Sequence, residues 1–307
     1  MTGRVFVLGA LRWNVIVTAP RMPRPEETLT GRGVEYALGG KGAHQAVAAA
    51  RMGAPVEMAG RLGRDDFAAR LLESLHRAGV GTGQIQRGPD ASGMSVAVVD
   101  ALGDYSAVLV GGANDMVDAE AVQLPQDTAV LCLQNEVPEA ANIAAARQAR
   151  ALGAKVLLDA APPRGPLASG LLALTDILVV NRSEANALTS AGLMRDALAA
   201  LRALGPRTAI MTLSGDGLVL AEGDAPPRAL PAVDVEVIST HGAGDCFVGT
   251  LAAGLAAGRG LDQALGLGQA AAALHVSTAR GARERITLAE AEALRAAQPH
   301  NRARRTG

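Results

Sequence analysis

Short apolar runs that end in a polar residue or a glycine recur along the chain. They cover residues 5–8, 56–60, 130–133, 155–158, 177–180 and 208–213, and continuous runs of this kind are typical of parallel strands buried on both faces. Segments of helical composition lie between them, at 46–52, 65–78, 138–152 and from about 183 onward. This alternation predicts an α/β fold with a mostly parallel central sheet and helices on both of its faces.

Two other pieces of the chain have the pattern of antiparallel strands. Residues 11–17 and 28–38 flank a proline-rich loop, and residues 94–99 and 106–110 flank a turn at 100–104, which predicts a hairpin. In the first of these strands, alternation places Arg12 and Asn14 on one face and Trp13 on the other. These pieces do not fit the strand–helix alternation, so they predict a small sheet outside the main one.

Polar side chains cluster directly after the predicted strands. Examples are Glu136, Asp159, Asn181 and Ser214, and Asp245 follows a β-like run at 233–238. In an open α/β sheet the ligand crevice lies at the carboxyl ends of the strands, so this pattern predicts a ligand site there.

Composition limits the classes of function. The chain has 307 residues, 49% of them hydrophobic, and a net charge of −1, which gives no overall attraction to nucleic acid. Its two cysteines imply no disulfide framework and fit a reducing cytosol, and no signal-peptide pattern precedes the first strand. Charged and glycine residues interrupt the apolar stretch at 251–276, so no membrane span is predicted. We therefore expect a cytoplasmic protein, with a disordered polar tail at 298–307.

Two glycine-rich turns, at 39–45 and 239–245, are each followed by a predicted helix, the second at 247–257. Such turns let backbone N–H groups point at one spot, which suits an anion. Asp245 could accept a proton from an attacking hydroxyl beside such a site. Alternatively, the second turn is an ordinary connection with Asp245 as a cap, and the first, which lacks the spacing of a P-loop or a dinucleotide fingerprint, is a packing turn.

Taken together, the two turns resemble the signatures of the ribokinase (PfkB-type) carbohydrate kinase family. Asn181-Arg182-Ser183-Glu184 resembles its Asn-x-x-Glu motif, and the segment 212–217 resembles its nucleotide-side glycine loop. The resemblance implies a three-layer α/β/α sandwich with a small β lid. The main domain would cover 1–10, 37–91 and 113–297, and the lid 11–36 and 92–112. Lids of this type often pair, which implies a homodimer through the lid.

The family also implies transfer of the ATP γ-phosphoryl group to a hydroxyl of a sugar or sugar-like substrate. Asp245 would be the base, and the backbone N–H groups of Gly242, Ala243 and Gly244 would hold the developing charge. Glu184 would orient Mg²⁺ through water. The implied substrate-binding residues are Arg12, Asn14, Gly40, Lys41, His44, Glu136 and Asp245, and the implied nucleotide-binding residues are Asn181, Thr212, Ser214, Gly215, Gly217 and Gln269.

The sequence departs from ribokinases on the substrate side. Those enzymes carry an Asn and an Asp at the positions of Arg12 and Asn14, and an Asn at His44. The carboxylate that grips two sugar hydroxyls is therefore missing. One hypothesis is that Arg12, Lys41 and His44 converge on an anionic group, as in a sugar phosphate or sugar acid. Alternatively, Arg12 points into solvent and His44 replaces a single hydrogen bond.

A second departure concerns the monovalent cation that activates many ribokinases. Its site would involve Ser239, His241 and Gly281, but Ser239 stands where those enzymes have an Asp, and Arg285 falls near their Ser. We expect poor K⁺ binding, with an arginine of the 280–285 loop in place of the cation. Alternatively, the loop aligns differently and backbone carbonyls still form the site.

Two further alternatives remain open from the sequence. Trp13 could stack on a base, as in a nucleoside kinase, or it could pack the lid interface. A catalytically inactive sugar- or nucleotide-binding regulator on the kinase fold is also possible, although a pure binder would need neither Asp245 nor Glu184. Of the remaining histidines, His275 is expected to be a hydrogen-bonded core residue.

Overall fold

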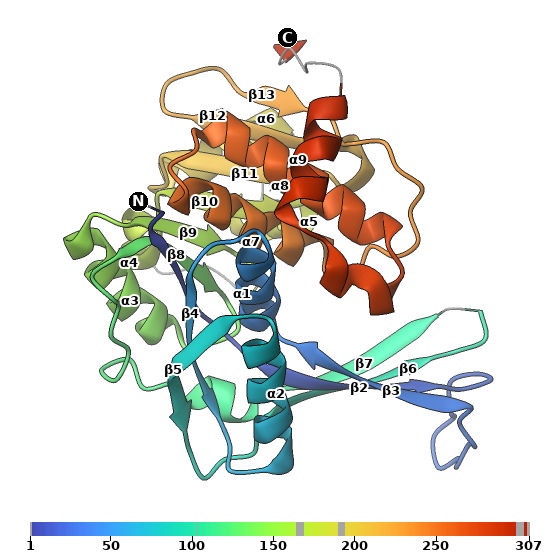
Figure 1. Ribbon diagram of the computed structural model, residues 1–307. Helices are drawn as coiled ribbons and strands as arrows, with labels where there is room; N and C mark the ends of the chain where they lie inside the picture. Colours follow the sequence, from blue (N-terminus) through green and yellow to red (C-terminus); the bar gives the residue numbers. More distant parts are fainter. Residues whose placement is uncertain (1, 103, 164–168, 190–193, 299–303, 306–307) are drawn as a thin grey trace.

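The computed structural model describes residues 2–102, 104–163, 169–189, 194–298 and 304–305, and it consists of a large sheet covered by helices and a smaller sheet that projects from it (Figure 1). The predicted α/β class and the separate antiparallel pieces are confirmed. Within the described residues, no helix is long and apolar enough to cross a membrane.

The main sheet has the strand order β14-β13-β12-β11-β10-β9-β8-β1-β4-β5. Its neighbours from β11 to β5 pair in parallel, and β12, β13 and β14 continue antiparallel at one edge. The strands are β1 (Arg4–Leu8), β4 (Val56–Leu62), β5 (Val80–Arg87), β8 (Thr128–Gln134), β9 (Lys155–Asp159), β10 (Ile177–Asn181), β11 (Thr208–Thr212), β12 (Leu218–Glu222), β13 (Arg228–Leu230) and β14 (Arg304–Arg305).

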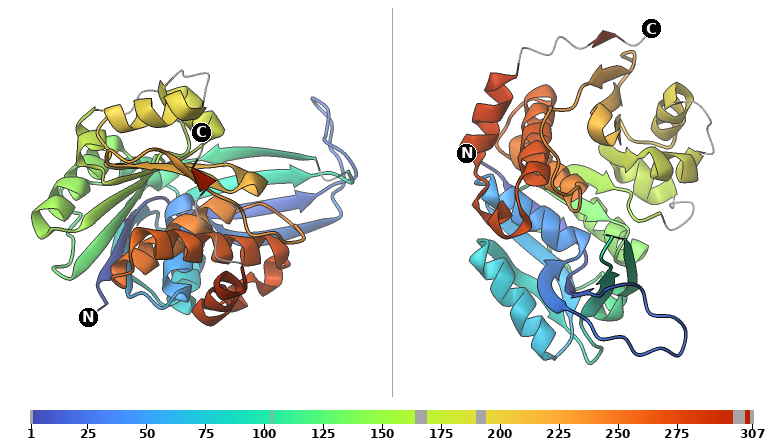
Figure 2. Two further views of the ribbon diagram at one scale, coloured as in Figure 1. Left: turned by 90° about the horizontal axis from the view of Figure 1, so that it is seen from above. Right: turned by 90° about the vertical axis from the view of Figure 1, so that its right-hand side faces the viewer.

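Helices cover both faces of this sheet and enclose two apolar cores (Figure 2). One face carries α1 (Lys41–Arg51), α2 (Asp66–Arg77), α7 (Ala243–Ala256), α8 (Leu261–Ser277) and α9 (Leu288–Ala297). The other carries α3 (Glu139–Leu152), α4 (Ser169–Leu174), α5 (Arg182–Thr189) and α6 (Met194–Ala203). Residues 5–8 of β1 and 129–133 of β8 are all apolar because both faces of these strands are covered by helices.

The smaller sheet, called the lid below, has the order β3-β2-β6-β7 and extends away from the body (Figures 1 and 2). It consists of β2 (Arg12–Thr18), β3 (Gly33–Gly39), β6 (Gly93–Val99) and β7 (Tyr105–Val110). The hairpin of β6 and β7 and the antiparallel pairing of β2 with β3 agree with the sequence pattern.

Several predicted boundaries were wrong. The strand predicted at 28–38 begins only at Gly33, because β2 ends at Thr18, which pairs with Gly33, and leaves no partner for earlier residues. The β-like run at 233–238 forms no strand, since Ile238 and Ser239 both donate to the single carbonyl of Val276 and no ladder follows.

Other elements were missed or start elsewhere. Both helices after the glycine turns begin earlier than predicted, at Lys41 and Ala243. The strands β5, β12 and β13 were not predicted. Short 3₁₀ helices cover Gly112–Met116, Ser214–Asp216 and Arg280–Arg285. Of the tail predicted to be disordered, residues 299–303 and 306–307 lie outside the described residues, and Arg304–Arg305 pair with β13.

Candidate active site

Asp245 lies in the first turn of α7, and its residue exposure is 7%. The helix is preceded by Gly242, whose φ of 80° is left-handed and therefore favours glycine. A Cβ at Gly242 would also approach His275 Nε2 to 3.1 Å. Ala243 N–H donates to Thr240 O at 3.2 Å, whereas among the described residues the N–H groups of Gly242 and Gly244 donate to no backbone carbonyl.

Asp245 is held by two donors from α1. Its Oδ1 accepts from Lys41 Nζ at 3.0 Å and from Gln45 Nε2 at 3.1 Å. The same two donors reach Oδ2 of Asp159, at 3.0 Å from Lys41 and 2.8 Å from Gln45. Lys41 and Gln45 are four residues apart and so share one face of α1, which brings both to the carboxylates. In the sequence, Gln45 is the last residue of the first glycine-rich turn and Asp159 follows a predicted strand, but neither residue was assigned an individual role.

These contacts shift the pKa values of the buried groups. Burial alone would raise the pKa of Asp245, but the charges and hydrogen bonds of Lys41 and His44 outweigh it and hold that pKa at about 2. Burial raises the pKa of Asp159 to about 7 against the opposing charge of Lys41. The pKa of Lys41 stays above its ordinary value despite burial, because two carboxylates surround the ammonium. Within the pair, Asp245 therefore stays ionised to a lower pH than Asp159, which titrates near neutral pH.

Arg12 is buried, with 6% of its surface exposed, and pairs with Oε1 of Glu136. The other oxygen of Glu136 accepts from the backbone N–H of Lys41 at 2.7 Å. The alternative that Arg12 points into solvent is therefore wrong. Gly40, the N-cap of α1, has φ 94°, and a Cβ there would lie 2.3 Å from the carbonyl of Ala10. Glycine is thus required where the chain crosses the site.

His44 connects the lid to Asp245. Its Nε2 donates to Leu38 O at 3.0 Å, and its Nδ1 lies 3.5 Å from Asp245 Oδ2. Because both ring nitrogens face acceptors, the imidazolium fits best, and the pKa of His44 is raised although burial opposes this. All three side chains predicted to attract an anionic substrate group, Arg12, Lys41 and His44, are thus paired within the protein.

Trp13 packs the lid against the body. Its ring stacks on Tyr36 at 6.3 Å between centroids and on Phe67 of α2 at 6.4 Å, and the residue is 8% exposed. This favours the packing interpretation of Trp13 over stacking on a nucleobase. Asn14 follows on the opposite face of β2, and a Cβ at Gly39 would lie 2.3 Å from its Oδ1.

Arg283 is bound to backbone carbonyls beside the glycine-rich turn at 239–245. Its guanidinium donates to Ser239 O at 2.9 Å, His241 O at 3.0 Å and Thr278 O at 3.1 Å, and the residue is 6% exposed. An arginine of the 280–285 loop was predicted to lie near the cation site. However, Arg285, which the sequence favoured, is exposed, and it makes no hydrogen bond or ion pair within the described residues.

Asn181 and Glu184 form a reciprocal cap at the start of α5. Asn181 Oδ1 accepts from Glu184 N at 2.9 Å, and the Glu184 carboxylate accepts from Asn181 N at 2.7 Å and Asn181 Nδ2 at 2.8 Å. Each carboxylate oxygen still has a free lone pair. The group therefore fits a water-mediated contact with Mg²⁺, in addition to its structural role.

The residues predicted to bind the nucleotide lie at the ends of β10 and β11 and on α8. Asn181 and Thr212 are neighbours in register, and Ser214 and Gly215 follow in the 3₁₀ turn. Gly217 and Gln269 both lie beside the carbonyl of Leu230. A Cβ at Gly217 would lie 2.1 Å from Leu230 O, and this oxygen accepts a hydrogen bond from Gln269 Nε2 at 3.3 Å.

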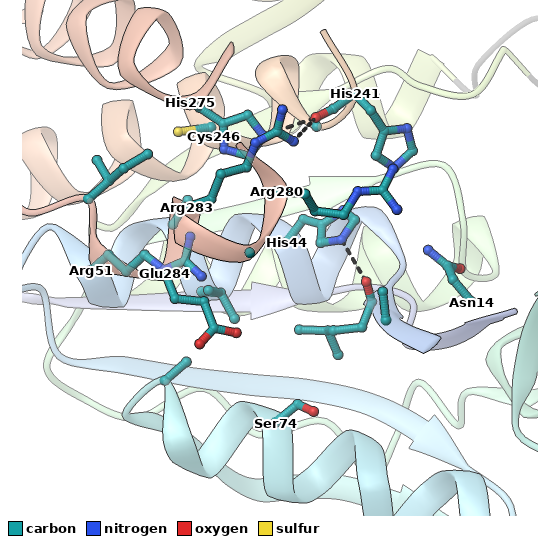
Figure 3. A pocket seen from close by; sticks show the side chains of 18 of the residues that line it. Asn14, His44, Arg51, Ser74, His241, Cys246, His275, Arg280, Arg283 and Glu284 are labelled. Carbon is teal, nitrogen blue, oxygen red and sulfur yellow. Dashed lines mark hydrogen bonds between the residues drawn. The ribbon is translucent and has the colours of Figure 1, made fainter. Parts of the chain in front are cut away.

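A cavity of about 560 Å³ opens beside the glycine-rich turn at 239–245 (Figure 3). It runs from Asn14 of the lid and His44 of α1, past His241 and Arg283, to Arg51 at the end of α1. Gly281, predicted for the cation site, also lines it. His275 borders the cavity, and its Nε2 donates to His241 O at 2.9 Å. His275 is thus hydrogen-bonded as predicted, but only partly buried.

Comparison with known proteins gives consistent results. Residues 3–286 match the model of the pfkB family of carbohydrate kinases. A ribokinase of Haemophilus influenzae is 34% identical over 292 residues, covering 91% of this chain and 94% of that protein. A ribokinase of Staphylococcus aureus is 32% identical over 302 residues, covering 94% and 98%. Arabidopsis thaliana ribokinase, solved with ribose and ATP, superposes with a TM-score of 0.88 at 26% identity, covering 96% and 99%.

Proposed function

The chain belongs to the pfkB family of carbohydrate kinases and is a phosphotransferase, and we propose that it transfers the γ-phosphoryl group of ATP to a hydroxyl of a neutral sugar. The observation that carries this proposal is the position of Asp245. Its carboxylate is clamped through Oδ1 by Lys41 and Gln45, and it lies in the first turn of a helix that begins with glycines.

Asp245 serves as the general base. Oδ1 accepts two hydrogen bonds, whereas Oδ2 has one longer contact, with His44 Nδ1 at 3.5 Å, so Oδ2 is the oxygen that takes the proton when the substrate O–H bond breaks. The electron pair of the hydroxyl oxygen forms the new bond to the γ-phosphorus, and the bond from that phosphorus to the ADP oxygen breaks. The proton ends on Asp245, and ADP carries away the negative charge of the leaving oxygen.

The start of α7 stabilises the charge that develops on the phosphoryl group. The unoccupied N–H groups of Gly242 and Gly244 and the positive end of the helix dipole provide this stabilisation. Ala243 contributes less than predicted, since its N–H already bonds to Thr240 O. Glu184 would hold Mg²⁺ through water, and the bound ion would supply neutralisation of the phosphate charge. Asn181, Thr212, Ser214, Gly215, Gly217 and Gln269 line the nucleotide.

Internal pairing supports a neutral substrate rather than an anionic one. Arg12 is committed to Glu136, and Lys41 to two carboxylates, so neither offers an uncompensated charge to a sugar phosphate or sugar acid. Asn14 replaces the carboxylate of ribokinases, so we expect ribose to bind more weakly than it does in that subgroup. A nucleoside substrate loses its main support because Trp13 is packed against Phe67.

Arg283 takes the place of a monovalent cation. Its guanidinium satisfies the carbonyls of Ser239 and His241, which are oxygens of the kind that K⁺ binds. Turnover is therefore expected to be independent of K⁺.

The lid provides the surface for a homodimer. Register places Tyr36, Val15, Val96 and Val108 in one row across the four strands. Three of them are largely exposed: Tyr36 is 56%, Val96 is 42% and Val108 is 67% exposed. An apolar row of this kind is typical of a contact between proteins, and a second lid of the same chain fits it.

The test is an assay of ATP-dependent phosphorylation with a panel of neutral sugars, sugar acids, sugar phosphates and nucleosides. We expect turnover of a neutral sugar. Asp245→Asn, matched in size, and Asp245→Ala should lower kcat at least ~10²-fold while nucleotide binding persists. Binding of sugar and ATP without turnover by the wild type would favour the inactive regulator. Near-normal kcat in the Asp245 variants would exclude this residue as the base.

A further inference from the structure

The two carboxylates that contact the Lys41 ammonium, those of Asp159 and Asp245, accept hydrogen bonds from the same two donors. Asp159 Oδ2 and Asp245 Oδ1 each accept one bond from Lys41 Nζ and one from Gln45 Nε2, with four distances between 2.8 and 3.1 Å. Lys41 and Gln45 therefore cannot move toward Asp245 without lengthening their bonds to Asp159.

The amide of Gln45 is fixed from behind. Gln45 is fully buried, and its Oε1 accepts from Gln134 Nε2 at 2.7 Å, so its NH₂ must face the two carboxylates. Gln134 is also fully buried, and its backbone carbonyl accepts from Asn142 at 2.9 Å. Lys41, Gln45, Asp159 and Asp245 thus form a clamp that joins α1, β9 and α7. Side chains of β8 and α3 support it from behind, so it is a buried network rather than a contact of surface charges.

Asp159 changes the charge that acts on Asp245. The charged and titratable groups that act on Asp159 are Lys41 of α1, Asp245 of α7, Glu184 of α5 and Cys132 of β8. Without the Asp159 charge, the Lys41 ammonium would neutralise Asp245 alone. A carboxylate paired tightly with one ammonium is a weaker proton acceptor, because the ion pair favours its charged form.

We propose that Asp159 is a positioning residue for phosphoryl transfer: it holds the far side of Lys41 and Gln45, so that Asp245 turns Oδ2 toward the acceptor hydroxyl and remains a competent base. This role rests on the kinase function proposed above. Asp159 itself touches no reacting atom in this scheme, since both of the donors that it shares with Asp245 lie between the two carboxylates.

The first test needs no turnover. The imidazole of His44, 3.5 Å from Asp245 Oδ2, reports the charge of the clamp and can be titrated by NMR, with His44→Asn assigning the resonance. Asp159→Asn removes negative charge, so the pKa of His44 should fall by about one unit. Asp65→Asn is the matched control, because Asp65 caps α2 and binds Ser92 without contacting the clamp. An unchanged His44 pKa in Asp159→Asn would overturn the proposal.

The second test is kinetic. Asp159→Asn should lower kcat about tenfold with the KM for ATP unchanged within about twofold, while Asp65→Asn should leave kcat unchanged. In Asp159→Asn, a shifted His44 pKa with normal kcat would overturn the positioning role. A lower kcat without that pKa shift would also overturn it, because a purely structural loss would give this result. If the wild type phosphorylates no sugar, the kinase proposal fails, and the His44 titration still decides whether Asp159 is coupled to Asp245.

Discussion

Replacing Arg283 with alanine tests whether its guanidinium stands in for a cation. The change removes three hydrogen bonds from a charged donor to the carbonyls of Ser239, His241 and Thr278. A hydrogen bond to a charged group contributes about 1.5–3 kcal/mol, but one buried side chain supplies all three, so we expect about 3 kcal/mol in total. In a chain of this length that corresponds to a Tm lower by roughly 5 °C.

Potassium should reverse part of this loss. In Arg283→Ala the carbonyls of Ser239 and His241 still converge on one point, and ~0.1 M K⁺ can bind there as it binds to other carbonyl groups. The assay is thermal denaturation in KCl against choline chloride at equal ionic strength. Arg285→Ala, at an exposed position of the same 3₁₀ helix, is the control and should behave as the wild type does.

Two results would refute this reasoning. One is an Arg283→Ala variant whose Tm is the same in both salts and close to that of the wild type, which would mean that the carbonyls need no cation. The other is a wild type whose Tm and turnover rise strongly with K⁺, because a guanidinium that already fills the site leaves no room for the ion.

Three further outcomes are expected. The raised pKa of His44 means that its contacts stabilise the fold below the ordinary histidine pKa and that this gain is lost as pH rises through the folded value. His44→Asn should therefore melt below the wild type at pH 6, and the difference in Tm should shrink as pH rises. Val108→Glu should give monomers by light scattering, and a dimer that persists would exclude the lid contact. The double substitution Arg12→Asn and Asn14→Asp should lower the KM for ribose about tenfold, and an unchanged KM would exclude this pair as the cause of weak binding.

Much of the fold follows from local sequence pattern. The buried parallel strands could be predicted because they are apolar on both faces, and β6 and β7 because a polar turn separates two alternating runs. The strand β5 could not, since its sequence has few large apolar residues and its pairing depends on β4. The strand predicted at 233–238 was wrong for the opposite reason: its residues suit a strand, but among the described residues they form no ladder with a neighbouring strand.

The candidate site could also be predicted from the sequence only in part. Motif spacing could locate Asp245 and Lys41, because a turn and a helix start are encoded by neighbouring residues. It could not show that Arg12 pairs with Glu136, 124 positions away, or that Lys41 is shared by Asp159 and Asp245. The sequence shows which cationic side chains belong to a site, but only the fold shows which of them are already paired with carboxylates. For this reason the sequence alone left an anionic substrate plausible.

The hydrogen bonds of Arg283 also predict an effect on catalysis. The carbonyl of His241 accepts from both Arg283 Nη1 and His275 Nε2, and it belongs to the peptide group whose N–H is that of Gly242. Hydrogen bonds to a peptide oxygen polarise the group and strengthen its N–H as a donor. Because burial lowers the pKa of His275 to about 4, the ring is neutral, and Arg283 supplies the charge. Arg283→Ala should therefore lower kcat as well as Tm, and K⁺ should restore both together. Recovery of Tm alone would mean that the peptide group of Gly242 does not depend on this charge.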